Sequence, residues 1–189
     1  MVVDLKERRR PRRRVLAGLA GIAGLVLAGG PLSAVAAPLA SRPRSLSFLH
    51  LHTRESLQVT YWAGGYIRPA LGEIDHLCRD FRTGEVHPIA PALLDLLHAL
   101  RRKLGTSEPF QIVSAYRCPA TNAKLAANSS GVAKKSLHMT GEAMDIRLAD
   151  RSCGQVFRAA RGLNAGGTGL YSRSNFVHVD VGRVRHWGG

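Results

Sequence analysis

The sequence predicts an α+β fold, in which a small antiparallel sheet is flanked by helices, and three observations support this class. Short extended patterns open and close the domain, helical spacing of apolar residues dominates its middle, and Gly or Pro residues separate the segments. Beyond residue 45 the sequence contains no internal repeat and no low-complexity tract. A single domain of mixed structure is therefore expected.

The domain opens with a predicted β-hairpin. Leu46, Phe48 and His50 alternate with their neighbours in an extended pattern. Residues 57–62 repeat this pattern, and the two glycines at 64–65 follow it as turn residues. The fold is therefore expected to begin near Leu46.

Two helices are predicted next, over residues 69–81 and 91–104. In both segments apolar residues recur at three- and four-residue spacing, which places them on one face of a helix. Pro91 suits the first turn of the second helix, and Gly105 ends that helix. The shorter elements expected after these are a strand at 110–115, a helix at 119–127, a strand at 143–148, a helix at 153–162, and strands at 169–171 and 176–181.

The first 36 residues have the three parts of an export signal, which are a basic head, an apolar stretch and a small-residue end. Arg12-Arg13-Arg14 stands directly before the apolar stretch, which is typical of the twin-arginine route. Cleavage is expected before Ala37, and residues 37–45 form a Pro- and Ser-containing linker to the domain at 46–189. The alternative is an uncleaved membrane anchor, although the apolar stretch is shorter than the roughly 20 residues that span a bilayer.

The charge of the chain points to an anionic partner. The formal net charge is +14, and the signal contributes +5 from seven Lys or Arg and two acidic residues, which leaves +9 on the mature chain. An exported basic protein suits an anionic polymer such as cell wall, or a membrane surface. Nucleic acid is not expected as a partner, because the basic residues are scattered and form no nucleic-acid-binding motif.

The cysteines do not indicate a metal-binding site. The three cysteines, Cys78, Cys118 and Cys153, show no CxxC spacing, so they do not predict a cysteine metal centre. Export permits one disulfide, and the sequence does not choose a pair.

Candidate metal-binding residues lie in two segments, residues 136–145 and 176–180. They offer His138, Asp145 and His178, two imidazoles and one carboxylate. Zn²⁺ accepts these ligand types, and a catalytic site keeps a fourth tetrahedral position open. The spacing alone leaves open that the histidines are ordinary core or surface residues.

The motifs around these residues, taken in order, resemble those of the murein endopeptidase K family. The matching stretches are Ser114-Ala115-Tyr116-Arg117, Asn122, Ser129-Ser130-Gly131, Lys134 to Gly141, and Asp145-Ile146-Arg147. The resemblance runs from about Leu46 to the C-terminus. The family shares the pattern SxHxxGxAxD with VanX-type D-Ala-D-Ala peptidases and with the zinc site of hedgehog domains, so the resemblance implies that zinc fold.

The resemblance implies one Zn²⁺ per chain, bound by His138, Asp145 and His178, and hydrolysis of murein cross-links in the periplasm after export by the twin-arginine translocase. It also implies that Arg117 approaches the substrate carbonyl and stabilises the developing oxyanion. The alternative for Arg117 is a structural arginine that holds a loop through carboxylate pairing. Ser136 and Asp180 are expected to orient the metal-binding imidazoles through their oxygens.

The general base is the point where the chain departs from the wider group. Relatives carry Glu or Asp three residues before the last zinc histidine, where this chain has Asn175, and some carry a second histidine where it has Phe176. An amide is no base, so Asp180, Glu142 and His186 remain as candidates. Asp180 is expected first, because it adjoins His178, and it is the second catalytic residue predicted beside Arg117.

Three functions remain open at this point. The leading hypothesis is a zinc endopeptidase that acts on cross-links containing meso-diaminopimelate. The alternatives are a D-Ala-D-Ala carboxypeptidase with the same chemistry, and a murein-binding zinc domain without catalysis. The remaining histidines at positions 50, 52, 76, 87 and 98 are expected to play no part in metal binding, and Trp62 and Trp187 either line a groove or pack.

Overall fold

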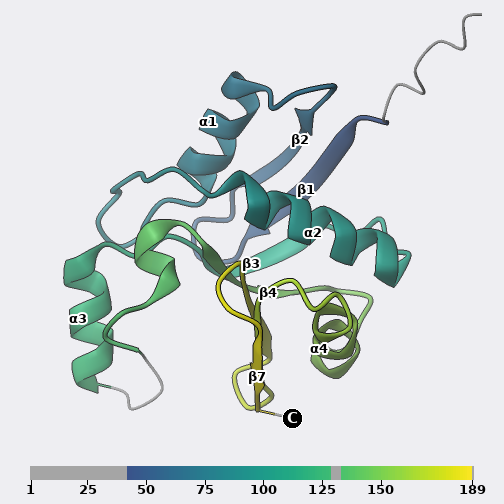
Figure 1. The fold of residues 1–189 in the computed structure, drawn as a ribbon. Helices are drawn as coiled ribbons and strands as arrows, with labels where there is room; N and C mark the ends of the chain where they lie inside the picture. The colour runs from purple at the N-terminus through teal and green to yellow at the C-terminus, as the bar shows by residue number, and fades with distance from the viewer. Residues whose placement is uncertain (1–41, 129–132, 189) are drawn as a thin grey trace, which may run out of the picture. The chain divides into compact units, whose positions relative to one another are not determined.

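A computed structural model describes residues 42–128 and 133–188 (Figure 1). The predicted export signal, its cleavage position and most of the linker lie outside the described residues. Within them the first strand begins at Arg44, two residues before the expected start at Leu46. No helix in the described ranges combines the length and the apolar character needed to cross a membrane.

The α+β class is confirmed, and the sheet is larger than expected and mixed. Seven strands lie in the order β2-β1-β3-β4-β6-β5-β7, in which β1 pairs with β3, and β5 with β7, in parallel. The predicted sheet was small and antiparallel; four of the six pairings are antiparallel, and the prediction is corrected at the two parallel ones. The strands are β1 (Arg44–His50), β2 (Ser56–Trp62), β3 (Phe110–Ser114), β4 (Ala143–Arg147), β5 (Gly167–Tyr171), β6 (Phe176–Asp180) and β7 (Arg185–Trp187).

The parallel pairing of β1 with β3 follows from the chain between them. Parallel neighbours need a long crossover connection, and the segment from β2 through two helices provides it. Strand β7 was not predicted from the sequence, because three residues are too few to show an alternating pattern.

The four helices are α1 (Arg68–Leu77), α2 (Pro91–Leu104), α3 (Pro119–Asn128) and α4 (Cys153–Arg161), and a 3-10 helix, η1, spans Leu137–Thr140. Helix α1 ends four residues before the expected Phe81. Beyond Leu77 the chain turns back on itself, and Asp80 accepts hydrogen bonds from the backbone N–H groups of Arg82 and Cys118. Helix α2 ends as expected, with Gly105 in a left-handed conformation at φ 60°.

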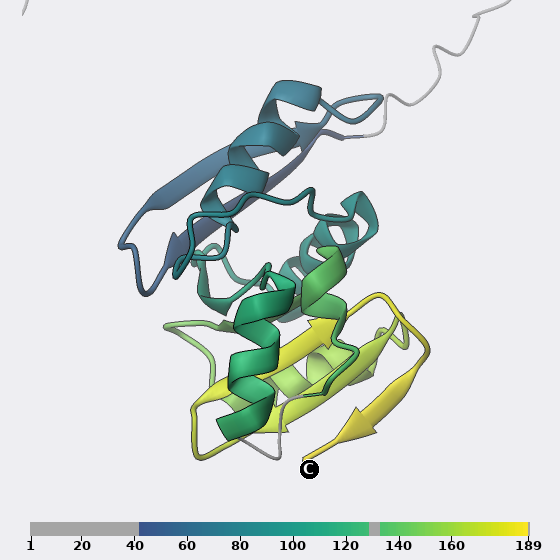
Figure 2. The same ribbon diagram turned by 90° about the vertical axis from the view of Figure 1, so that its left-hand side faces the viewer.

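Helices cover both faces of the sheet. Figure 1 shows the C-terminal strands edge-on, with α3 on one side and α4 on the other. In Figure 2 helix α3 lies in front of these strands, and the β1–β2 hairpin forms the other end of the sheet. The main core lies where α2 packs on the sheet, and it leaves the α3 side of β4 and β6 free for polar side chains.

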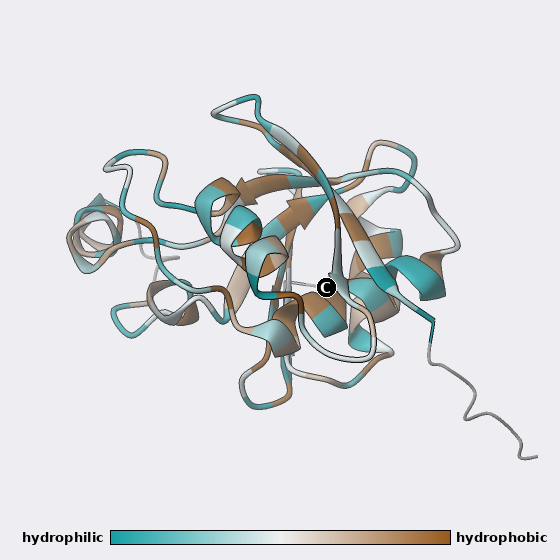
Figure 3. Ribbon diagram, turned by 90° about the horizontal axis from the view of Figure 1, so that it is seen from above, coloured by the Kyte–Doolittle hydropathy of each residue, from teal (hydrophilic) through white to brown (hydrophobic). Residues whose placement is uncertain are grey.

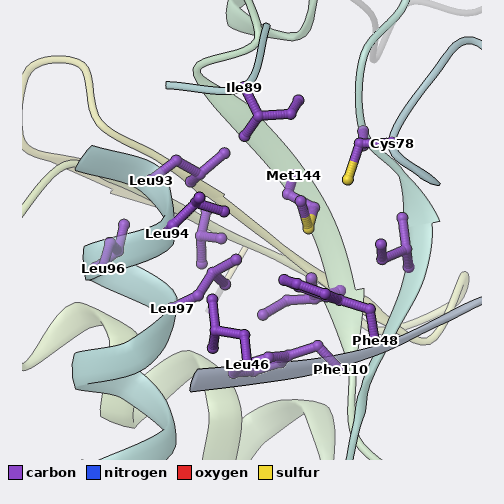
Figure 4. Packing of buried hydrophobic residues seen from close by; sticks show 14 of the residues in the cluster. Leu46, Phe48, Cys78, Ile89, Leu93, Leu94, Leu96, Leu97, Phe110 and Met144 are labelled. Carbon is purple, nitrogen blue, oxygen red and sulfur yellow. The ribbon is translucent and has the colours of Figure 1, made fainter. Parts of the chain in front are cut away.

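Apolar packing between α2 and the first strands holds the domain together. Leu93, Leu94 and Leu97 of α2 are fully buried against Leu46 and Phe48 of β1 (Figure 4). Hydrophobic residues gather along the central strands, whereas each helix carries hydrophobic and hydrophilic residues side by side (Figure 3). This amphipathic distribution is the one that the helical spacing in the sequence predicted.

Candidate metal centre

The candidate site lies on a row of residues that runs straight across the sheet. Ser114 of β3 pairs with Asp145 of β4, Asp145 with His178 of β6, His178 with Gly169 of β5, and Gly169 with Trp187 of β7. Directly paired residues project from the same face of a sheet. The strand register therefore brings Asp145 and His178 together, and it places Trp187 at the end of the same row.

Glycine at position 169 makes this row compact. A Cβ atom there would clash with the indole ring of Trp187. The ring therefore lies directly on the strand, with its centroid 5.3 Å from that of the His178 imidazole. Trp187 also donates from its indole N–H to the hydroxyl of Tyr171, at 3.1 Å. Of the two tryptophans, Trp187 lines the site, and Trp62 packs under the guanidinium of Arg44.

His138 reaches the row from the tight turn formed by η1. Ser136 caps this turn, because its hydroxyl accepts a hydrogen bond from the backbone N–H of His138 at 3.4 Å. Gly141 ends it at φ 67°, and a Cβ atom there would clash with the carbonyl oxygen of Pro88. Ser136 was expected to contact an imidazole, and the structure corrects this to a backbone contact that shapes the turn.

Three ligand atoms converge where this turn meets the sheet. The Nδ1 atom of His178 lies 2.9 Å from Oδ1 of Asp145, and Nε2 of His138 lies 3.3 Å from both of these atoms. In a tetrahedral zinc site with bonds of about 2.0–2.2 Å, neighbouring ligand atoms lie about 3.3 Å apart. The three residues therefore form one ion-sized face of a tetrahedron.

When both imidazoles are neutral, their hydrogen-bond partners leave this face without protons. Nδ1 of His138 lies 2.6 Å from the carbonyl oxygen of Ala115, and Nε2 of His178 lies 3.0 Å from Oδ2 of Asp180. Oxygen acceptors fix the ring proton on these two nitrogens. In the neutral imidazoles the opposite nitrogens then carry lone pairs, which point at each other and at the Asp145 carboxylate. A cation resolves this conflict, so the residues fit a metal ion.

The electrostatic setting favours the metal-binding forms of His138 and Asp145. Burial lowers the pKa of the His138 imidazole. Burial raises the pKa of the Asp145 carboxyl, but its contacts with His138 and His178 outweigh burial and hold that pKa well below its usual range. Metal ligands must be deprotonated, and these two groups meet that requirement at neutral pH.

The triad lies in a cleft of about 410 Å³. Arg117 lines this cleft and is only 8% exposed. Its backbone N–H donates to the carbonyl oxygen of His138 at 3.2 Å, which ties the arginine to the metal-binding turn. Its Nε–H finds no acceptor among the described residues. Burial lowers the pKa of this guanidinium, because its positive charge is partly removed from water. An anion that bound in the cleft would offset this desolvation cost.

Comparison with known proteins places this site in a family. The model of the family described as peptidoglycan L,D-endopeptidase MepK matches residues 38–187. The chain belongs to this family. The peptidoglycan L,D-endopeptidase MepK of Escherichia coli (strain K12) is 44% identical over 176 residues, which cover 93% of this chain and 96% of that protein. The probable peptidoglycan L,D-endopeptidase MepK of Haemophilus influenzae is 37% identical over 181 residues, which cover 94% of this chain and 96% of that protein.

Membership in the MepK family confirms the resemblance seen in the motifs, and with it the expectation that this chain is a peptidase and thus a hydrolase. The predicted function, a murein endopeptidase, agrees with the description of the family. The polypeptide covers nearly the whole length of both relatives.

The structure argues against Asp180 as the general base. Asp180 is fully buried and does not line the cleft. Its two oxygens accept hydrogen bonds from His178, from the backbone N–H groups of Gly167 and Gly182, and from Arg185. Burial raises the pKa of its carboxyl, but these donors outweigh burial and keep that pKa well below its usual range. The arrangement leaves Asp180 as a positioning residue for the His178 ring.

Replacing Asp180 by asparagine is expected to weaken zinc binding about 10- to 100-fold, the usual cost of losing a carboxylate behind a metal-binding histidine. Because Asp180 does not face the cleft, turnover at saturating zinc is expected to stay within a few-fold of wild type. A chelator competition assay and a zinc titration of activity measure the two quantities. Loss of activity that excess zinc does not restore would reinstate Asp180 as the base.

The other base candidates do not reach the cleft either. Glu142 accepts a hydrogen bond from the hydroxyl of Thr140 at 2.6 Å, and His186 is exposed on β7. Asn175 lies in the turn before β6 at φ 54°, and its side-chain oxygen accepts a bond from Cys153. None of these residues lines the cleft.

Several cleft residues were missed by sequence reasoning because they come from distant segments. They are His52 after β1, Arg82 after α1, Tyr171 at the end of β5, and Arg185 of β7. No local motif marks them. Only the sheet order and the placement of the loops bring them beside the triad.

Proposed function

We propose that this chain is a zinc endopeptidase that hydrolyses cross-links containing meso-diaminopimelate in murein. The observation that carries the proposal is the convergence of three ligand atoms from His138, Asp145 and His178 on the floor of a cleft that also holds the buried Arg117. Two nitrogens and one carboxylate oxygen match the ligand sets of catalytic zinc sites. The names of the relatives, which are L,D-endopeptidases of peptidoglycan, support the substrate class.

The metal ion, Arg117 and the hydrogen-bond partners of the two imidazoles have separate roles in the proposed reaction. When bound, zinc lowers the pKa of a water molecule to about 7 and polarises the scissile carbonyl group. Arg117 stabilises the negative charge that develops on the carbonyl oxygen, because its guanidinium is already buried beside the triad and lacks an anionic partner in the described residues. Asp180 and the carbonyl group of Ala115 keep both imidazoles in the ring orientation that metal binding needs.

The shape of the cleft favours an endopeptidase over a carboxypeptidase. The triad residues lie on β4 and β6, and the lining extends to His52 beyond β1 on one side and to Trp187 on β7 on the other. A peptide that continues in both directions from the scissile bond needs such a cleft. The complete triad and Arg117 also speak against a murein-binding domain without catalysis.

Digestion of purified sacculi separates these functions. Zinc-loaded protein is incubated with sacculi, and the released and remaining muropeptides are identified, with the His178→Ala variant as the control. A fall in cross-linked dimers is the expected result. Shortened stem peptides at constant cross-linking would mean a carboxypeptidase, and an unchanged profile with bound protein would mean a binding domain.

The proposed location is the periplasm. Murein lies outside the cytoplasmic membrane, so an enzyme that acts on it must be exported. The twin-arginine pattern at Arg12-Arg13 supports that route, with the translocase as a transient partner. The +9 charge of the mature chain supports peripheral contact with the cell wall or the membrane.

Replacing both Arg12 and Arg13 by lysine is expected to leave the precursor in the cytoplasm, because the route reads the arginine pair itself and not its charge. Cell fractionation and the size of the protein band measure this. The matched control replaces Arg8 and Arg9 by lysine and is expected to be exported normally. Normal export of the Arg12/Arg13 variant would contradict the assigned route.

A further inference from the structure

The lining of the cleft is strongly cationic. It contains Arg82, Arg117, Lys135 and Arg185, but Asp145 is the only carboxylate among its described residues, and that group faces the two histidines. Arg185 is neutralised by Asp180 at 2.7 Å, and Arg117 lies at the triad. Arg82 therefore remains as a cleft arginine with a role still to be explained.

Arg82 is held in place although it is exposed to solvent. Its guanidinium carbon lies 4.1 Å from the centre of the Phe81 ring, and the imidazole of His52 stacks on that ring at 4.0 Å and 9°. Two groups at this distance cannot share one face of a ring, so Phe81 lies between His52 and Arg82. Stacking of this kind restricts a long side chain and leaves its N–H donors free at the edge.

A buried carboxylate fixes the backbone that carries Arg82. Asp80 is fully buried, and its Oδ1 accepts from the backbone N–H of Arg82 at 3.0 Å. Its Oδ2 accepts from the backbone N–H of Cys118, the residue after Arg117, also at 3.0 Å. One side chain thus sets the position of Arg82 relative to Arg117. An arginine that served only as a solvent-exposed surface charge would not need its backbone to be fixed by a buried carboxylate.

No salt bridge or side-chain hydrogen bond of Arg82 occurs within the described part of the chain. We propose that Arg82 is a specificity-determining residue, which binds a free carboxylate of the substrate close to the scissile bond. A guanidinium presents paired N–H donors that match a carboxylate. This inference rests on the proposed function and names the chemical feature that the cleft recognises beside the bond.

The chemistry of diaminopimelate supplies such a carboxylate. When the side-chain amino group is acylated in a cross-link, the carbon that bears the scissile nitrogen also bears a carboxyl group. That group is anionic when free and neutral when amidated. Arg82 is therefore expected to distinguish two cross-links that differ only in this modification.

The test compares a purified cross-linked dimer with its amidated form on three proteins, namely wild type, Arg82→Gln and Arg102→Gln. Arg102 is an exposed arginine of α2 outside the cleft and serves as the matched control. For the free-carboxylate dimer we expect Arg82→Gln to raise KM about 10- to 100-fold, the usual range for losing a hydrogen bond between charged groups. In Arg82→Gln, the kcat value, the KM for the amidated dimer, the zinc content and Tm should change little. Arg102→Gln should resemble wild type in all of these quantities.

Two outcomes overturn the inference. One is an Arg82→Gln enzyme that keeps the wild-type preference between the dimers, and the other is an equal loss on both dimers with a lowered Tm, which would mean a structural role. If the wild type cleaves neither dimer, the proposed function fails. Calorimetric binding of the two dimers then decides the role of Arg82 by itself, since the inference requires a preference for the free carboxylate that Arg82→Gln removes.

Discussion

Replacing His178 by alanine is expected to abolish zinc binding and to lower turnover on murein cross-links about 1000-fold or more. The variant loses one of three ligand atoms that lie within 2.9 to 3.3 Å of one another, and it leaves Asp180 without its imidazole partner. A bound metal contributes several kcal/mol to transition-state stabilisation, and each 1.36 kcal/mol corresponds to about tenfold in rate. Metal analysis and muropeptide release measure the two effects.

The matched control for this variant is His186→Ala. His186 is also a C-terminal histidine on a strand, but it is exposed and does not line the cleft. It is expected to keep one equivalent of zinc and near-normal turnover. A folded His178→Ala protein that retains one equivalent of zinc would show that the ligand set is wrong.

Replacing Arg117 by lysine is expected to lower kcat about 100- to 1000-fold, the usual cost of removing one oxyanion donor. Lysine keeps the charge but loses the planar set of donors. Zinc content and Tm are expected to stay unchanged, because the contact of Arg117 with the metal-binding turn runs through its backbone N–H. The measurements are steady-state kinetics, metal analysis and thermal melting on the same preparation.

Arg147→Lys provides the control for this change. Arg147 lies on β4 outside the cleft and donates from its guanidinium to the side chain of Gln111. Its replacement should leave kcat near the wild-type value. Near-normal turnover of Arg117→Lys would remove Arg117 from the mechanism, and a parallel fall in Tm and zinc content would make it a structural residue.

The fold was predictable where local patterns decide it. The leucines of α2 and the alternation in β1 and β2 give strong periodic signals, and all three elements form as expected. Helix α1 was predicted too long, since Cys78 and Phe81 continue the helical spacing. The hydrogen bonds of Asp80, which end the helical path, depend on Cys118, 38 residues away. Strand pairing likewise depends on distant partners, so the parallel pairings left no local signal.

The three residues proposed as metal ligands could be found from the sequence because a short motif carries two of them and an alternating strand carries the third. The cleft around them was not. Arg82 and Tyr171 come from separate loops and strands, and only the three-dimensional arrangement joins them to the triad. Asp180 shows the limit most clearly. Its position beside His178 suggested a base, whereas its buried hydrogen bonds favour a role in positioning the ring, which the Asp180→Asn variant tests.

We propose that one zinc ion, held by His138, Asp145 and His178, is required for cleavage of a murein cross-link. The most direct test of this requirement is a titration of metal-free protein with Zn²⁺ while turnover of a purified L,D-cross-linked dimer is measured. We expect no cleavage at zero zinc and a linear rise in turnover that reaches a plateau at one equivalent. Full activity of the metal-free protein, or a plateau that the His178→Ala variant reaches equally well, would contradict it.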